Sequence, residues 1–529
     1  MKLAGCASIT DRHYRYVKEP PMIRRPFATT ALALVLAAAI AAPGSAGPED
    51  NSLTIGIGEE LPGFDGYIST SRDGVVMTRQ LFDMLIYRNP ETFEYEPLLA
   101  TEWSQIDDLT WEFKLREGVT FHDGSPFTAE DVAWTLTTYA DPETGARSQR
   151  SVSWIDTVEA VDDTTVRITS KQPFPSALEF VAGSLPIYPS DYAQEVGLEA
   201  FSQAPIGTGP YRLEEASGGT YTLKAFENYF EGGGKGMPSI ETLVVRIIPD
   251  TATRIAEVIG GNVEWIWNVP ADQVPQLDSL PSLKAELGST MRIAMVTLDA
   301  AGRANADTPL ADPKVRQAIN HAIDRDAIVA NLVGGDGEVI NVPCYPLQFG
   351  CDTSAGVSYD FDPDKARALL EEAGYGDGFS IKMASFRDRA RAEAVQSYLS
   401  AVGIEVDLEM LQARASFSAW REGDIDAWYG DWGSFSIADT SASMGNFYDG
   451  GTNDGARDEE ITALMDEANT SVDAATRQEA YAQAIKLATE RAYWVPMHTI
   501  VMGYAYAADL NFTPTVDELP RFFLASWAQ

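Results

Sequence analysis

Apolar and polar residues recur along the chain with two periods, which together predict a mixture of strands and helices. The segment 111–115 (WEFKL) is apolar at every second position and predicts a half-buried strand, whereas 243–248 (LVVRII) predicts a more fully buried one. Helical spacing of apolar residues, in three cases after a capping residue, predicts helices over 128–139, 312–323, 362–374 and 474–491. We find no fixed-period repeat and no low-complexity linker, so we expect interleaved domains.

An uncharged apolar run of 15 residues, 28–42, lies near the N-terminus. Arg24 and Arg25 precede it and small residues follow it, which is typical of a secretory signal peptide cleaved near Ala46. The run is shorter than the roughly 20 residues of a membrane span. Met22 is a better candidate than Met1 for the translation start, so we interpret 1–46 as a leader whose signal peptide is 22–46. Export by the general or the twin-arginine route stays open.

Composition narrows the functional classes. The chain has 529 residues, which at about 150 residues per domain corresponds to three or four domains. It carries 39 Lys and Arg against 78 Asp and Glu, a net charge of −39. This charge repels phosphate backbones and anionic lipid, so we expect no nucleic-acid partner. No later stretch approaches 18 apolar residues, and we expect a soluble periplasmic protein without a lipid anchor.

Motifs for catalysis or metal binding are missing from the sequence. There is no Gly-x-Ser-x-Gly, His-Glu-x-x-His or Walker A sequence. Three histidines follow the leader, and none has a histidine or cysteine partner at ligand spacing. We therefore expect no metal, no cofactor and no enzymatic activity, although paired carboxylates leave an exported hydrolase as an alternative.

Two cysteines remain after the leader, Cys344 and Cys351, within the short segment CYPLQFGC. In an oxidising compartment we expect them to form a disulfide. A loop this short contributes about 2.5 kcal/mol in the chain-entropy model. The spacing is not that of a Cys-x-x-Cys redox pair.

Several motifs occur in a fixed order along the chain. They are LFDML (81–85), EPLLATEW (96–103), WEFKLREGVTFHDGSPFTAEDV (111–132), PIGTGPY (205–211), DPKVRQAI (312–319) and DPDKARALLEEAGY (362–375). Together they resemble the extracytoplasmic solute-binding proteins of the oligopeptide, dipeptide and nickel class, family 5, of ABC importers. The resemblance spans nearly all of residues 53–510.

The resemblance implies an α/β fold, namely the bilobed periplasmic-binding-protein fold of cluster C, with two hinge-connected lobes and an extra domain. The hinge strands would lie near 292–298 and 499–506. Lobe I would comprise 47–82, 204–291 and 500–529, the additional domain packed on it 83–203, and lobe II 292–499. The implied function is capture of a small molecule or peptide between the lobes and its delivery to ABC permease subunits in the inner membrane. We expect a monomer.

The resemblance also suggests an anchor for the ligand. In peptide-binding members a Trp-x-x-Asp run carries the acid that holds the peptide ammonium, and here Trp428, Asp431 and Trp432 occupy such a run. The family usually continues with an Asp-Pro-rich loop, but this chain reads GSFSIADTSAS over 433–443. That departure keeps a nickel chelate, an opine or a sugar-like solute open as the ligand, with Asp439 as a second candidate acid.

Aromatic and basic residues complete the predicted ligand site. Trp267 lies at a strand end that the family places beside the cleft, and Phe64 and Tyr67 follow the first strand at its rim. Aromatic rings bind peptide bonds, sugars and cations alike, so they do not identify the ligand. Arg387 is the predicted anchor for a ligand carboxylate. A motility or sensing partner protein is a further alternative function.

Overall fold

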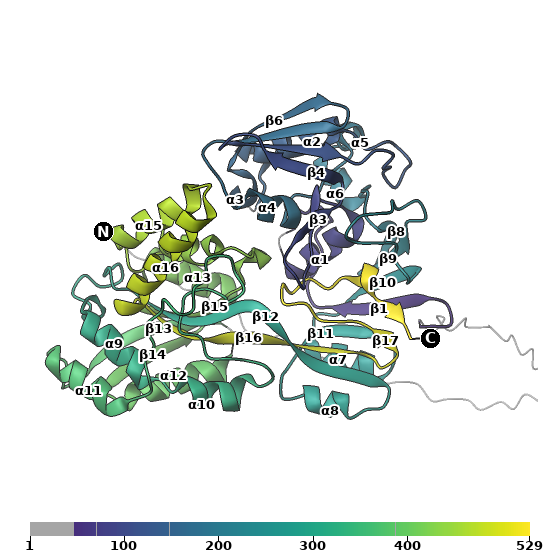
Figure 1. Ribbon diagram of the computed structural model, residues 1–529. Helices are drawn as coiled ribbons and strands as arrows, with labels where there is room; N and C mark the ends of the chain where they lie inside the picture. The colour runs from purple at the N-terminus through teal and green to yellow at the C-terminus, as the bar shows by residue number, and fades with distance from the viewer. Residues whose placement is uncertain (1–46, 70, 148, 387, 529) are drawn as a thin grey trace, which may run out of the picture. The chain divides into compact units, whose positions relative to one another are not determined.

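The computed structural model describes residues 47–528 apart from positions 70, 148 and 387 (Figure 1). The predicted signal peptide therefore lies outside the described residues. Within the described part of the chain, no helix is long and apolar enough to cross a membrane.

One mixed sheet of ten strands forms the centre of the fold. In spatial order its strands are β14 (Ile404–Met410), β13 (Phe379–Ser385), β15 (Ala427–Trp432), β12 (Leu283–Leu298), β16 (Trp494–Ala507), β11 (Trp265–Val269), β1 (Ser52–Ile57), β10 (Thr242–Ile247), β9 (Thr220–Ala225) and β8 (Tyr211–Ser217). We call the β11-to-β8 end, with the elements packed on it, lobe I. The β15-to-β14 end, with its helices, is lobe II.

The long antiparallel strands β12 and β16 belong to both lobes. Residues 283–289 pair with 501–507 in lobe I, and residues 293–297 pair with 494–499 in lobe II. The register shifts between Ser289 and Ile293, where the strands pass from one lobe to the other. A break in a ladder is a place where backbone angles can change, so the two lobes are joined through this irregular stretch.

Lobe I has a core on each face of its sheet. On one face, leucines and tryptophans of β1, β10 and β11 pack with α1 (Arg72–Leu81) and the C-terminal segment, which includes β17 (Leu510–Asn511) and β18 (Ser526–Trp527). On the other face, α7 (Thr251–Ile259) and α8 (Val274–Asp278) cover Ile266 and Val269. β10 differs from the sequence prediction: Leu243 and Val245 are buried but Val244 is only half-buried.

A second sheet, of four antiparallel strands, packs on lobe I and shares its core. Its strands are β4 (Ala100–Gln105), β5 (Thr110–Leu115), β7 (Thr165–Ser170) and β6 (Ile155–Asp162). The ribbon β2 (Ile86–Arg88) and β3 (Tyr95–Pro97) leads into it. The helices of this region are α2 (Ala129–Ala140), α3 (Gln149–Val152), α4 (Ala177–Gly183), α5 (Ser190–Val196) and α6 (Leu198–Gln203).

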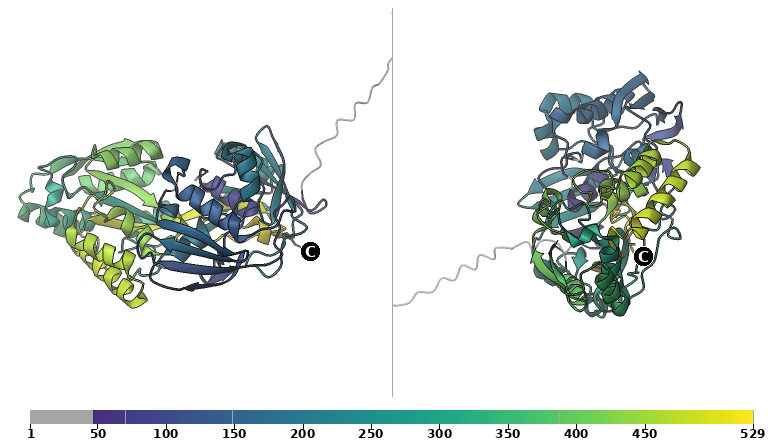
Figure 2. Two further views of the ribbon diagram at one scale, coloured as in Figure 1. Left: turned by 90° about the horizontal axis from the view of Figure 1, so that it is seen from above. Right: turned by 90° about the vertical axis from the view of Figure 1, so that its left-hand side faces the viewer.

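Lobe II has a helix layer on each face of its sheet (Figures 1 and 2). Ala294 and Val296 face the layer of α9 (Pro313–Ala322), α10 (Arg325–Ile328), α11 (Pro363–Glu372) and α12 (Arg389–Ser400). Ile293 and Met295, one residue out of phase, face α13 (Ala413–Glu422), α14 (Met444–Phe447), α15 (Glu459–Thr470) and α16 (Ala474–Glu490).

The four predicted helices are present with nearly the predicted ends. Thr128 and Asp131 form the capping box of α2. Asp312 and Asp362 cap α9 and α11, each followed by a proline in the first turn. α16 begins at Ala474 after the cap of Asp473. These helices were predictable because their caps and apolar stripes lie within one short stretch of sequence.

Candidate functional site

A cavity of about 250 Å³ lies between the lobes. Lobe I and the four-stranded region contribute one wall, and the end of β15 with the loop after it contributes the other. The lining residues are Gly66, Tyr67, Arg72, Val75, Thr78, Met84, Ser151, Gly183, Ser184, Pro186, Arg292, Trp432, Gly433, Ser434 and Phe435. A cavity that both lobes must complete is suited to holding a small solute when they close.

Two arginines bring positive charge to this cavity. Arg292, on β12, donates from Nη1 to Asp431 Oδ1 at 2.6 Å. Its Nε and Nη2 donate to the two carboxylate oxygens of Glu518 at 3.1 and 3.0 Å. Arg72, at the start of α1, lies 3.0 Å from the same Glu518 carboxylate. The cavity therefore contains paired guanidinium groups that planar carboxylates already bind.

The electrostatic environment of the two arginines differs. The neighbouring carboxylates of Glu518 and Asp431 raise the pKa of Arg292 despite its burial. Burial is the largest effect on Arg72 and lowers its pKa, while Glu518 acts in the opposite direction. Both side chains remain cations at neutral pH, because arginine starts far above that range.

Aromatic side chains form the remaining walls. Tyr67 stacks on Tyr139 with ring centroids 3.9 Å apart and donates from its hydroxyl to the Pro186 carbonyl at 3.0 Å. Trp432 is fixed by its indole N–H, which donates to the Ala442 carbonyl at 2.7 Å. Phe435 meets Trp432 edge-on at 5.1 Å and keeps 59% of its surface exposed. Such rigid rings can pack against the apolar part of a solute.

A second cavity, of about 560 Å³, lies on the α12 side of β15 and also contacts Arg292. Tyr429 and Asp431 point to this side, because they alternate with Trp428 and Trp432, which point to the other. Asp431 therefore lies between the two cavities and reaches the first through its ion pair with Arg292.

The structure places Trp428 and Asp439, both predicted to meet the ligand, outside the walls of the two cavities. Trp428 is fully buried under α13 and α14, and its indole N–H donates to Ser416 Oγ at 2.9 Å. Asp439 accepts from Arg477 Nη2 at 2.6 Å and from the Tyr481 hydroxyl at 2.9 Å. Their partners are core and helix residues, so Trp428 is a packing residue and Asp439 fixes its loop on α16.

Trp267 and Phe64 are also core residues and not part of the cavity wall. Trp267 is buried beside Trp265 and Tyr504, with centroids 5.7 and 6.5 Å away. Phe64 is buried against Tyr221 in an edge-on contact at 5.1 Å. Both sit in the apolar layer of lobe I, where burial of a large ring stabilises the fold.

Three predicted residues do lie at the cavity. Tyr67 and Trp432 line it, and Asp431 adjoins it as the partner of Arg292. Arg387 lies outside the described residues. Sequence reasoning missed Arg72, Arg292 and Glu518, although Arg292 falls at the start of a segment predicted as a hinge strand.

Cys344 and Cys351 are joined by a disulfide, with an S–S distance of 2.04 Å and Cα atoms 5.9 Å apart. His498 is buried and His122 is half-buried, and desolvation lowers the pKa of each to about 4. Among the described residues, no three His, Cys, Asp or Glu side chains gather closely enough to hold a metal ion.

Two α/β lobes joined by long strands, with a cavity completed by both, define the class of periplasmic solute-binding proteins. The family model "Bacterial extracellular solute-binding proteins, family 5 Middle" matches residues 94–455, and the chain belongs to this family. It is a family of non-catalytic solute-binding proteins.

Named relatives and a solved structure agree with this assignment. The glutathione-binding protein GsiB of Pectobacterium atrosepticum is 30% identical over 322 residues, which cover 58% of this chain and 59% of the relative. GsiB of Escherichia coli strain K12 is 27% identical over 398 residues, 72% of this chain and 73% of that one. The structure of HbpA2 from Haemophilus parasuis superposes with a TM-score of 0.77 at 26% identity, covering 90% of this chain and all of that one.

Proposed function

We propose that this protein is the substrate-binding component of an ABC importer and captures a small peptide-like solute that carries at least one carboxylate. It works in the periplasm as a monomer, after export by the 22–46 signal peptide, and delivers its ligand to permease subunits in the inner membrane. We assign its lobes the boundaries expected from the sequence, with the additional domain 83–203 on lobe I. Binding to both lobes favours the closed state, which the permease recognises.

The observation that carries the ligand class is the pair of arginines in the interlobe cavity. Arg72 and Arg292 present planar guanidinium groups, whose geometry matches a carboxylate and allows two parallel hydrogen bonds. The carboxylates of Glu518 and Asp431 hold these groups in place. A ligand carboxylate would share the guanidinium protons left on the cavity side.

The size and walls of the cavity support a small ligand. Its volume of about 250 Å³ lies just below the roughly 300–1,000 Å³ of small-molecule sites, which favours a di- or tripeptide-sized solute over a long peptide. Tyr67, Trp432 and Phe435 offer rings for the ligand backbone or side chains. The naming of two relatives as glutathione-binding proteins supports a peptide-like ligand with carboxylates.

A second hypothesis retains Asp431 as the anchor for a ligand ammonium. Asp431 is buried and its carboxylate already pairs with Arg292. An ammonium would have to share that carboxylate with the guanidinium, and like charges close together oppose each other. A ligand carboxylate is also repelled by Asp431 and Glu518, but it meets two guanidinium groups, those of Arg72 and Arg292, and for that reason we place the carboxylate-first arrangement ahead of the ammonium-first one.

Thermal unfolding with a panel of solutes tests the proposed function. Binding to the folded state alone stabilises it by about 2.7 kcal/mol at a hundredfold excess of ligand over Kd. We expect reduced glutathione and acidic dipeptides to raise Tm. A shift with only an opine, a sugar or nickel–histidine would refute the peptide-like ligand, and turnover of the bound solute into products would indicate an exported hydrolase.

A further inference from the structure

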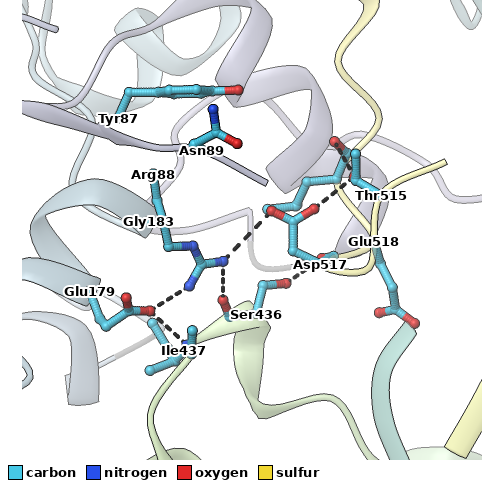
Figure 3. A network of polar contacts seen from close by, with 12 residues as sticks. Tyr87, Arg88, Asn89, Glu179, Gly183, Ser436, Ile437, Thr515, Asp517 and Glu518 are labelled. Carbon is cyan, nitrogen blue, oxygen red and sulfur yellow. Dashed lines mark hydrogen bonds and ion pairs between the residues drawn. The ribbon is translucent and has the colours of Figure 1, made fainter. Parts of the chain in front are cut away.

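The loop after β15 makes polar contacts across the gap between the lobes (Figure 3). Arg88, at the end of β2, donates from Nη2 to the Ser436 carbonyl at 2.6 Å. Glu179, on α4, accepts from the Ala438 backbone N–H at 2.6 Å. Arg88 and Glu179 also pair with each other at 2.5 Å. We call these two side chains with the two backbone groups the latch.

The lobe I half of the latch is fixed by its own surroundings. The Glu179 carboxylate accepts from the Tyr95 hydroxyl at 2.5 Å, and Arg88 lies 3.6 Å from the Asp517 carboxylate. Both latch side chains are buried, with less than a tenth of their surface exposed. Because their partners lie in lobe I and the four-stranded region, donor and acceptor are oriented before the loop docks, which lowers the entropy cost of docking.

The docked loop has a strained backbone. Ser434, Phe435 and Ser436 are consecutive non-glycine residues with φ of 51°, 52° and 63°. The left-handed region is unfavourable for an L-residue, and such conformations persist when surrounding contacts determine them. Here those contacts are cross-lobe: besides the latch, Arg72 donates to Ser436 Oγ at 2.8 Å, and that hydroxyl donates to the Asp517 carbonyl at 2.6 Å.

The same strained turn forms part of the cavity. Ser434 and Phe435 line it directly, immediately after Trp432. The backbone conformation of three residues therefore determines where the phenyl ring of Phe435 stands at the cavity. Contacts that hold this turn must also hold the wall that meets the ligand.

We propose that Arg88 and Glu179 are positioning residues of the ligand site. They fix the left-handed turn 434–436 when the lobes close, and thereby couple closure to the shape of the cavity. The inference rests on the proposed function only in taking the interlobe cavity as the ligand site. Neither side chain lines the cavity. They act through the backbone of the loop, which makes the latch separable from the ligand anchors.

Glu179→Gln and Arg88→Lys test the latch, with Glu112→Gln as the matched control. Glu112 pairs with Arg167 within the four-stranded sheet, away from the loop. We expect Kd for reduced glutathione to rise about 10- to 100-fold in the latch variants, mostly through faster dissociation, and to stay unchanged in the control. We expect the apo Tm to fall further in the latch variants than in the control, because the Arg88–Glu179 pair is buried, so Kd is measured at a temperature where every variant is folded.

A distance measurement makes the test independent of the ligand. Spin labels at Asp162→Cys and Asp466→Cys report the separation of the four-stranded sheet from α15, since both positions are exposed. We expect Glu179→Gln to shift the distance distribution toward longer separations, with or without glutathione. If glutathione fails to bind the wild type but this shift is seen, the proposed ligand is wrong and the latch stands.

Ser434→Gly is a variant for which we expect the opposite change, a fall in Kd. The Ser434 hydroxyl has no hydrogen-bond partner among the described residues, so its loss removes no hydrogen bond. Glycine relieves the left-handed strain but gains freedom in the undocked loop, and we expect a net fall in Kd of about 2- to 5-fold. Unchanged dissociation rates and unchanged distances in both latch variants would overturn the proposal.

Discussion

The ion pair between Arg292 and Asp431 distinguishes the two hypotheses for how a peptide-like ligand is oriented. The two side chains meet at 2.6 Å and keep 16% and 3% of their surfaces exposed. Asp431→Asn preserves the shape of the carboxylate and removes its charge. Arg292 retains its two hydrogen bonds to Glu518, so the guanidinium stays in place.

The sign of the change in affinity depends on which ligand group is bound. If Asp431 holds a ligand ammonium, losing a buried charge pair costs about 2–5 kcal/mol, a 30- to 5,000-fold rise in Kd. If Arg292 holds a ligand carboxylate, the variant removes a like charge. At about 6 Å and an effective dielectric constant of about 20 that repulsion is of order 1–3 kcal/mol, which predicts binding that is 5- to 150-fold tighter.

Titration calorimetry with three related ligands measures whether Asp431→Asn raises or lowers the affinity. The ligands are reduced glutathione, an N-acetylated acidic dipeptide without an ammonium, and an amidated dipeptide without a C-terminal carboxylate. We expect Asp431→Asn to bind the acetylated dipeptide more tightly than wild type. Asp299→Asn is the control, because Asp299 is a buried partner of Arg303 at 2.9 Å and lines neither cavity. Weaker binding of the acetylated dipeptide to Asp431→Asn, with wild-type affinity in the control, would refute the carboxylate-first arrangement.

Three further predictions concern the whole chain. Thiol labelling of the denatured, unreduced protein should detect neither Cys344 nor Cys351; two labelled thiols would contradict the bond. Burial lowers the pKa of His122 and His498 to about 4 from 6.5, so below pH 6.5 the unfolded state binds the extra protons. Stability is full above pH 6.5 and falls toward pH 4 by up to about 3 kcal/mol per histidine; urea unfolding of a His122→Asn, His498→Asn variant at pH 7 and 4.5 should show a smaller drop. Raising ionic strength should speed association of glutathione, because it screens the net charge of −39; slower association in stopped-flow traces would contradict this.

Local signals made much of the fold predictable from the sequence. A cap, a proline and an apolar stripe within about a dozen residues were enough for α2, α9 and α11. The period-two pattern over 111–115 predicted the β5 strand. Period does not say which layer covers a face. The expectation that Trp267 and Trp428 meet the ligand came from the family resemblance, and both side chains are buried in the core.

The ion pairs of the site could not be predicted in the same way. Asp431 and Arg292 are 139 residues apart, and they meet because β12 and β15 are antiparallel neighbours in the sheet. Glu518 reaches Arg292 from 226 residues away, through the C-terminal segment that returns to lobe I. A Trp-x-x-Asp run identifies an acid but not its partner, and the partner decides whether that acid is available to a ligand ammonium.

The whole chain is strongly acidic, whereas the charged side chains that line the interlobe cavity are the arginines Arg72 and Arg292. Acidic residues outnumber basic ones twofold, with 78 Asp and Glu against 39 Lys and Arg. Long-range attraction therefore does not bring an anion to this protein, and recognition of a carboxylate must come from direct contact. Arg72 and Arg292 can provide it, because low exposure limits screening by salt and Glu518 keeps both guanidinium groups in place. Docking of the loop after β15 would strengthen these contacts further by removing water from the cavity. Selection of an anionic ligand therefore depends more on the closed state than on the first encounter between ligand and protein.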